Sequence, residues 1–149
     1  MYQYIFRTWT EAFQDAYPIR LQVFVHEQNI PIDLEIDEYD QVAQHLIVFL
    51  NLKPIGTARI FNADGNEESH LKIGRLALLE EHRHQGIGSK MMERLLDYAQ
   101  NNNCKKLSLN AQIDALVFYE KFGFIAEELV FDEGGILHRQ CIKYLVGVQ

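Results

Sequence analysis

The sequence predicts a mixed α/β fold in one domain, with a central, mostly antiparallel sheet of six or seven strands and helices on both faces. The chain has 149 residues with 48% hydrophobic content, enough to bury a core without disulfides or metals. Strand-like and helix-like segments follow in the order β, α-α, β-β-β, α, β, α, β-β. Neither repeats nor linkers interrupt them, so we expect a single domain over residues 1–149.

The first half of the chain is expected to form a strand, a helical region and three further strands. Apolar residues recur at three- and four-residue steps over residues 11–28, and Pro18 is expected to divide this region into two helices. The acidic, proline-containing stretch 29–41 is expected to be a loop. Strands are predicted at 2–7, 45–51, 54–62 and 70–79, with a turn at 63–68.

The second half contains the clearest amphipathic helix. Over residues 87–100 an apolar stripe faces away from a charged one, as expected for a helix packed on a sheet. The remaining predicted elements are a strand at 104–112, a helix at 114–122, and a final hairpin with strands at 124–131 and 136–145 around the turn 132–135.

Charge and composition exclude several classes of protein. The chain has 14 basic and 21 acidic residues, a net charge of -7, and no basic run, so neither nucleic acid nor an anionic membrane is expected as a partner. Two cysteines, Cys104 and Cys141, make neither a disulfide framework nor a metal site. With no signal-like start and no long apolar run, we expect a cytoplasmic protein that binds no metal, and a homodimer is left open.

The stretch "HRHQGIGSK", residues 82–90, lies between a predicted strand and the amphipathic helix. A helix N-terminus offers unpaired N–H groups to an anion, and Gly86 and Gly88 remove the Cβ atoms that would block its approach. Arg83, His84 and Lys90 add donors that suit a pyrophosphate. A glycine pair alone is more typical of a simple turn with solvated basic neighbours, and neither the P-loop nor the dinucleotide spacing is present.

The pattern "RHQGIG" (83–88), preceded by "GRLALLEEH" (74–82) and followed by "FYEKFGF" (118–124), resembles the GNAT superfamily of N-acetyltransferases along essentially the whole chain. The front segment "RLQVFVHEQNIPIDLEIDEYD" (20–40) is similar to the ElaA-like and YjcF-like bacterial members. The chain has Glu80 and His84 where such proteins often have proline and glycine.

The resemblance implies acetyl-CoA as co-substrate, bound where the fourth and fifth strands splay apart. It implies phosphate contacts from the backbone between Arg83 and Ser89, and pantetheine bound like an added strand along the fourth strand. The implied cofactor-binding residues are Leu76, Ala77, Leu78, Arg83, His84, Gln85, Gly86, Ile87, Gly88, Ser89 and Asn110.

Acetyl transfer to an amine needs a neutral amine, a stabilised oxyanion and a proton for the departing thiolate. The resemblance assigns the general acid to Tyr119 and the oxyanion donor to the backbone N–H of Leu78. The base is open: the candidates are Glu27, His138, Glu35 and His45, and the enzyme can also lack a dedicated base.

Arg59 and Arg75 lie on neighbouring predicted strands at nearly matched distances from the turn that joins them. They would either clamp a carboxylate or phosphate of the acceptor or pair with Glu35, Asp37 and Asp40 of the acidic loop.

The sequence therefore predicts an acetyl-CoA-dependent N-acetyltransferase that acts on a primary amine of a small molecule or peptide by direct transfer in a ternary complex. A covalent route through Cys104 or Cys141 is the weaker alternative. The competing functions are a non-catalytic acyl-CoA sensor and an acyl-homoserine-lactone synthase-like enzyme.

Overall fold

One seven-stranded sheet organises the chain, and the predicted mixed α/β class is confirmed. The computed structural model describes residues 1–64 and 69–145, so residues 65–68 of the predicted turn lie outside it. The strand order is β1-β2-β3-β4-β5-β7-β6, and β4 and β5 are the parallel neighbours among the described strands. The strands are β1 (Tyr2–Arg7), β2 (Gln44–Leu50), β3 (Lys53–Phe61), β4 (His70–Leu78), β5 (Lys106–Gln112), β6 (Ile125–Glu133) and β7 (Ile136–Tyr144).

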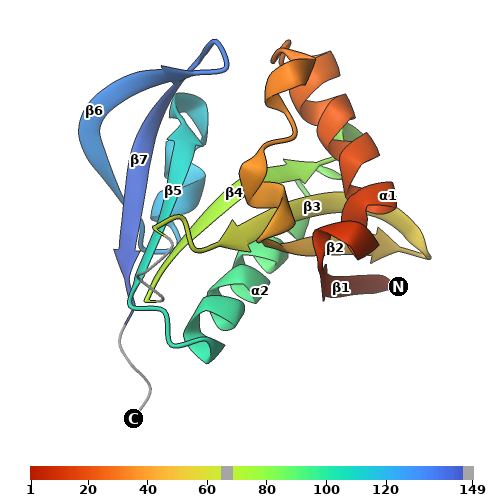
Figure 1. Cartoon of the computed structure of the whole chain (residues 1–149), viewed down its shortest axis with the longest axis horizontal. Coiled ribbons are helices and arrows are strands. Elements are labelled where there is room, and N and C mark those ends of the chain that lie inside the picture. Colours follow the sequence, from red (N-terminus) through yellow and green to blue (C-terminus); the bar gives the residue numbers. More distant parts are fainter. Residues whose placement is uncertain (65–68, 146–149) are drawn as a thin grey trace.

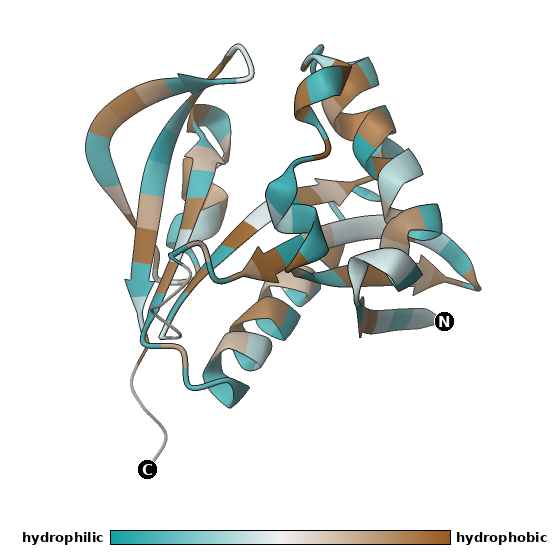
Figure 2. Ribbon diagram, viewed as in Figure 1, coloured by the Kyte–Doolittle hydropathy of each residue, from teal (hydrophilic) through white to brown (hydrophobic). Residues whose placement is uncertain are grey.

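Helices cover both faces of the sheet, as predicted (Figure 1). On one face lies α1 (Trp9–Arg20), whose Trp9, Ala12 and Ala16 pack against buried residues of β2. On the other lies α2 (Ile87–Asn101), whose apolar stripe joins the main core while charged residues face outward. Figure 2 shows this as hydrophobic and hydrophilic bands that alternate along α2. The short helix α3 (Leu116–Glu120) follows β5.

The sheet splays between β4 and β5, which confirms the expected divergence. The two strands pair only from His70 to Ile73 and from Lys106 to Leu109. Beyond these residues β4 continues to pair with β3, and β5 continues with β7. Figure 1 shows the two strands moving apart from this point. The facing edges of the opened strands therefore carry backbone groups that pair with no strand.

The predicted break at Pro18 is wrong, because α1 runs through Pro18 to Arg20 and continues directly as a π-helical segment, η1 (Leu21–Glu27). Proline removes one N–H donor, but the next turn closes when the N–H of Leu21 donates to the carbonyls of both Tyr17 and Pro18. Burial then holds the continuous segment on the sheet through Ala16, Ile19, Val23 and Phe24. Within the described residues no helix is both long and apolar enough to cross a membrane.

Candidate active site

A cavity of about 830 Å³ opens where β4 and β5 separate. Segments far apart in the sequence line it, including η1, the acidic loop, the turn before α2, α3 and the turn between β6 and β7. The structure therefore brings together most of the sequence-predicted site residues: Arg59, Arg75, Leu76, Leu78, Arg83, His84, Gly86, Gly88, Ser89, Asn110, Tyr119 and His138.

Three residues of the predicted cofactor set, Ala77, Gln85 and Ile87, do not line the cavity. The N–H of Leu79 donates to the carbonyl of Ile55 at 2.9 Å, and backbone groups in an antiparallel pair alternate in direction. Leu78, opposite Gly56, therefore turns its N–H and C=O away from β3, whereas Ala77 turns its own toward β3. The side chain of Ile87 is buried in the main core.

The turn before α2 presents a row of backbone donors. His84 and Gly86 have left-handed φ values of 64° and 84°. Within residues 1–64 and 69–145 no acceptor pairs with the N–H groups of His84, Gln85 and Gly86, and the first N–H groups of α2 have no partner inside the helix. Apart from Gly86 itself and its two chain neighbours, no heavy atom of the described residues lies within 4 Å of where a Cβ of Gly86 would stand. This turn is an open concavity of N–H groups that suits a phosphate.

The side chain of Arg83 is engaged with the protein. Its Nε donates to the carbonyl of Leu78 at 2.8 Å, and its Nη2 donates to both carboxylate oxygens of Glu27 at 2.9 and 3.1 Å. Two predicted site residues are thus paired with each other. Glu27 does not line the cavity. Phosphate contacts at this turn therefore fall first to the backbone.

Tyr119 reaches the cavity from α3. Its ring meets Phe118 edge-on at a centroid distance of 5.1 Å and Phe124 at 6.3 Å. Burial raises the pKa of the Tyr119 hydroxyl well above its usual value, so the phenol keeps its proton. A Cβ at Gly88 would stand 3.5 Å from the Phe118 ring, an ordinary van der Waals distance, so α3 lies beside the start of α2.

His138 lies on β7, is 7% exposed and lines the cavity. Its Nδ1 lies 2.7 Å from the carbonyl oxygen of Ile136, and its ring stacks on Phe131. A carbonyl only accepts, so Nδ1 donates, and in the neutral ring Nε2 keeps a lone pair. No described residue hydrogen-bonds to that Nε2.

The two other candidate bases are committed elsewhere. His45 is buried and does not line the cavity; its Nε2 lies 3.0 Å from the carbonyl oxygen of Asp40, and burial lowers its pKa. Glu35 lines the cavity, but its carboxylate is almost completely buried and forms ion pairs with Arg20 and Arg75.

The acidic loop is held to the sheet by three arginines and three carboxylates, which we call the arginine–carboxylate cluster: Arg20, Glu35, Asp37, Asp40, Arg59 and Arg75. The two terminal nitrogens of Arg59 donate hydrogen bonds to the two carboxylate oxygens of Asp37, at 2.6 and 2.8 Å. Arg75 donates to the carbonyls of Leu34 and Glu35.

Arg59 and Arg75 lie at nearly matched positions across the hairpin, as expected, because Arg59 pairs with Gly74, the neighbour of Arg75. The register shifts between Thr57 and Arg59, and Arg75 lies in this bulge with a left-handed φ of 50°. The two guanidinium groups still meet on the same loop, where both contact Asp37.

The cluster changes the acidity of its carboxylates. Burial alone would raise the pKa of Asp40, but its hydrogen bonds and charge contacts with Arg20 and Arg59 outweigh burial and lower the pKa to about 2. Asp37 is affected in the same way: burial acts to raise its pKa, and Arg59 and Arg75 lower it. Both carboxylates are therefore ionised at neutral pH.

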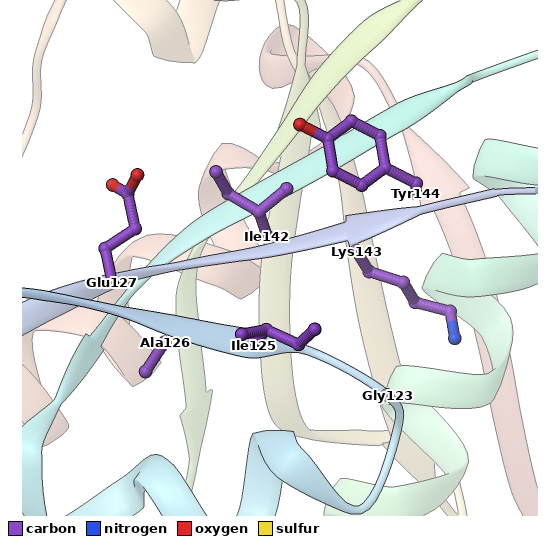
Figure 3. A pocket seen from close by; sticks show the side chains of 7 residues that line it. All are labelled: Gly123, Ile125, Ala126, Glu127, Ile142, Lys143 and Tyr144. Atoms are coloured by element: carbon purple, nitrogen blue, oxygen red, sulfur yellow. The ribbon is translucent and has the colours of Figure 1, made fainter.

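A second hollow, of about 410 Å³, lies between the ends of β6 and β7. Figure 3 shows Lys143 and Tyr144 projecting to opposite sides of β7 there. None of the sequence-predicted site residues lines this hollow. Cys104 and Cys141 are both buried and line neither cavity, and burial raises the pKa of each thiol. Among the described residues no group of three histidine, cysteine or acidic side chains is arranged to hold a metal ion.

Several residues of the site escaped the sequence analysis. Lys72 lies in the strand 70–79 but outside the motif that begins at Gly74, and Arg20 lies inside a helical pattern. Gln28 and Gln112 both line the cavity and form a 2.8 Å hydrogen bond across 84 residues of sequence. Only the acidity of residues 33–40 signalled that cationic partners were needed.

Comparison with known proteins agrees with this geometry. Residues 1–124 match the Acetyltransferase (GNAT) family. YjcF of Bacillus subtilis (strain 168), named as an uncharacterized N-acetyltransferase, is 37% identical over 134 residues, covering 89% of this chain and 93% of YjcF. ElaA of Escherichia coli (strain K12) is 33% identical over 122 residues, covering 80% of this chain and 79% of ElaA.

Solved structures agree as well. The crystal structure of Escherichia coli ElaA matches with a TM-score of 0.85 and 27% identity, covering 96% of this chain and 99% of the other. An acyl-CoA N-acyltransferase from Pseudomonas aeruginosa matches with a TM-score of 0.85 and 25% identity, again covering 96% and 99%.

The splayed sheet and the N–H-lined turn at the start of α2 are thus those of an acyl-CoA-dependent acyltransferase. The chain belongs to the GNAT acetyltransferase family, and the family uses acetyl-CoA.

Proposed function

We propose that the protein transfers the acetyl group of acetyl-CoA to a primary amine of a small molecule or peptide, directly and within one ternary complex. The observation that carries this proposal is the cavity between β4 and β5, which has the N–H-lined turn at one end and Tyr119 and His138 in its walls. The whole chain is proposed to act as one acyl-CoA N-acyltransferase domain, because the same sheet runs from β1 to β7.

Acetyl-CoA is proposed to bind along the opened edge of β4. The N–H groups from His84 to Ser89 would hold the pyrophosphate. The backbone of Leu76 and Leu78 would hold the pantetheine arm, with Asn110 facing it from β5. Support comes from the N–H of Leu78, which points away from β3, and from the open space at Gly86.

The proposed chemistry divides the two proton transfers between two residues that line the cavity, His138 of β7 and Tyr119 of α3. His138, through Nε2, would take the proton that the acceptor amine loses as its nitrogen attacks the thioester carbonyl carbon. The N–H of Leu78 would stabilise the oxyanion. As the C–S bond breaks, Tyr119 would donate a proton to the thiolate, a role supported by its position in the cavity wall and by a raised pKa that keeps its hydroxyl protonated beforehand.

His138 is preferred to Glu27 as the base for two reasons. Glu27 is held by Arg83 and does not line the cavity, whereas the Nε2 of His138 is free within it. The pair of Arg83 and Glu27 is instead proposed to fix the end of η1 to the carbonyl of Leu78.

Direct transfer is preferred to a cysteine-bound intermediate. A cysteine nucleophile has to reach the thioester as a thiolate. Cys104 and Cys141 are 3% and 0% exposed, and burial raises the pKa of each. Neither lines the cavity.

The test is thiol release from acetyl-CoA in the presence of a panel of amines. Tyr119→Phe should lower kcat by about 10²-fold with little change in acetyl-CoA affinity, because the hydroxyl acts only on the departing thiolate. His138→Gln should lower kcat by a similar factor. This reduction in kcat should become smaller as the pH rises, because more of the acceptor amine is then neutral without a base. Full activity of both variants would remove the assigned roles, and absence of thiol release with every amine would remove the proposed reaction.

A further inference from the structure

We propose that the acceptor amine also carries an anionic group, a carboxylate or a phosphate, and that the ammonium group of Lys72 binds it. This inference rests on the proposed function, because it concerns the acceptor end of the same cavity. It goes further by naming the chemical class of the acceptor and the residue that selects it.

Lys72 lies at the closed end of the opening between β4 and β5. It pairs with Phe61 of β3 and with Ser108 of β5, one residue before the last β4–β5 pair. Its neighbours Leu71 and Ile73 point into the main core beneath α2, so the side chain of Lys72 points to the opposite face. That is the face covered by the acidic loop, and Lys72 lines the cavity there.

The positive charge of Lys72 has no ion-pair partner among residues 1–64 and 69–145. The arginine–carboxylate cluster contains three arginines and three carboxylates, so its formal charges cancel. Glu35, Asp37 and Asp40 all have arginine partners. In the part of the chain that the structure describes, the Nζ of Lys72 has no hydrogen-bond or ion-pair partner. This end of the cavity is therefore suited to an anion, although the whole chain is acidic.

A second donor in the same wall lacks a partner. The Nε of Arg59 is a buried side-chain nitrogen without a hydrogen-bond partner among the described residues, and Arg59 is only 4% exposed. It lies 3.5 Å from where a Cβ of Gly74 would stand. Gly74 comes two residues after Lys72, so a side chain at this position would project to the same face of the sheet. Because glycine has none, the cavity wall that contains Lys72 and Arg59 has more room.

The remaining wall at this end is flat and aromatic. The rings of Tyr39 and Phe61 stack at a centroid distance of 4.7 Å, and the guanidinium of Arg59 lies over Phe61 at 5.0 Å. An amine joined by a short apolar linker to a carboxylate or phosphate would place the linker against this wall and the anion at Lys72. A cationic or neutral acceptor would leave Lys72 unpaired.

The experiment compares kcat/KM for amines of similar length and different charge: β-alanine, O-phosphoethanolamine, 3-amino-1-propanol and 1,3-diaminopropane. The wild-type protein should prefer the two anionic amines. Lys72→Met should lower the ratio of anionic to neutral kcat/KM by about tenfold or more, since it removes a charge-assisted contact and keeps the side-chain length. Lys72→Arg should retain most of the ratio. Which anionic amine is preferred separates a carboxylate from a phosphate.

Two further variants make the comparison specific. Lys53→Met, at an exposed lysine that does not line the cavity, should leave the ratio unchanged. Gly74→Ala places a methyl group at ordinary contact distance from Arg59, so it should fold normally and raise the KM of the anionic amines. An equal preference for neutral or cationic amines in the wild-type protein would overturn the inference.

A binding measurement decides the matter where turnover is too slow to compare. Calorimetry on the CoA-loaded protein should show that N-acetyl-β-alanine binds and that Lys72→Met weakens it about tenfold or more. No binding of this anion to the CoA-loaded protein would contradict the inference and leave the proposed function standing. Failure of the protein to bind CoA at all would instead contradict the proposed function.

Discussion

His84 adopts a left-handed backbone conformation, φ 64°, in the turn that is proposed to hold the pyrophosphate. A side chain with a Cβ is strained in this region by about 1–2 kcal/mol, whereas glycine is not. GNAT proteins often have glycine at this position, and the left-handed φ value explains why glycine suits it.

His84→Gly should therefore raise the free energy of unfolding by about 0.5–1 kcal/mol, after the extra flexibility of glycine in the unfolded chain is subtracted. Denaturant unfolding with an unchanged m-value measures this. Gln85→Gly, at the neighbouring position without a left-handed φ, is the matched control and should lower stability. A loss of stability in His84→Gly as large as in the control would contradict the argument.

Individual site residues were most directly predictable where they belong to a motif. The glycine pair and Tyr119 could be placed because their spacing resembles a family pattern, and both line the cavity. The direction of the Arg83 side chain was not predictable, since its partner Glu27 lies 56 residues away. Lys72 was missed because a lysine in a strand is usually solvated, and only the tertiary structure turns it into the cavity.

The acidic loop is the element whose position depends most on charge. Asp40 is completely buried and accepts hydrogen bonds from Arg20 at 2.7 and 3.1 Å and from Arg59 at 2.9 Å. Removing one partner of a buried ion pair leaves the other charge without compensation, which typically costs about 3–5 kcal/mol.

Asp40→Asn should therefore lower the free energy of unfolding by about 3–5 kcal/mol, because it keeps the shape of the side chain and removes only its charge. Chemical denaturation measures the change. Glu38→Gln, an exposed acid in the same turn, should change stability by less than about 0.5 kcal/mol. Equal effects of the two substitutions would show that the cluster does not hold the loop.

Most elements were predictable from periodicity, and the exceptions have local causes. The predicted bounds of the strand 2–7 and of the helix beginning at Ile87 agree closely with the structure, because each segment has a clear apolar pattern. The predicted helix break at Pro18 was wrong, because burial of Ile19 and Val23 on the sheet outweighs the loss of one N–H donor. The bulge at Arg75 left no signal in the sequence, since an arginine there predicts no left-handed φ.

For the whole molecule, the cluster predicts how stability depends on pH. The folded-state pKa of Asp40, about 2, lies below its ordinary value of 3.8, and that of Asp37 is lowered too. A depressed folded-state pKa adds stability that is complete above the unfolded-state pKa and is lost as pH falls toward the folded-state one. Asp40 therefore adds about 2–3 kcal/mol above roughly pH 4.

Unfolding free energies measured by urea at several pH values should decrease slightly below about pH 6.5, because the buried imidazole of His45 has a lowered pKa, and should fall further between about pH 4 and pH 2. Asp40→Asn should flatten that fall by removing its largest single contribution. A wild-type stability that is the same at pH 5 and pH 2.5 would contradict the assigned pairing.

At the scale of the fold, element order and hydrophobic pattern were enough to predict a mixed sheet with helices on both faces. The splay between β4 and β5 could be expected only through the resemblance, because no periodicity shows where two strands stop pairing. The cavity and its proposed acceptor end follow from that divergence.

The central claim is that the opening between β4 and β5, with the N–H-lined turn at its end, binds coenzyme A. Titration calorimetry of the protein with CoA tests it most directly, with Gly86→Val as the matched variant that puts a branched side chain into the open, left-handed position of that turn. We expect saturable one-to-one binding to the wild-type protein and a loss of about tenfold or more in affinity for Gly86→Val. Absence of binding to the wild-type protein, or equal affinity of the two, would contradict the claim.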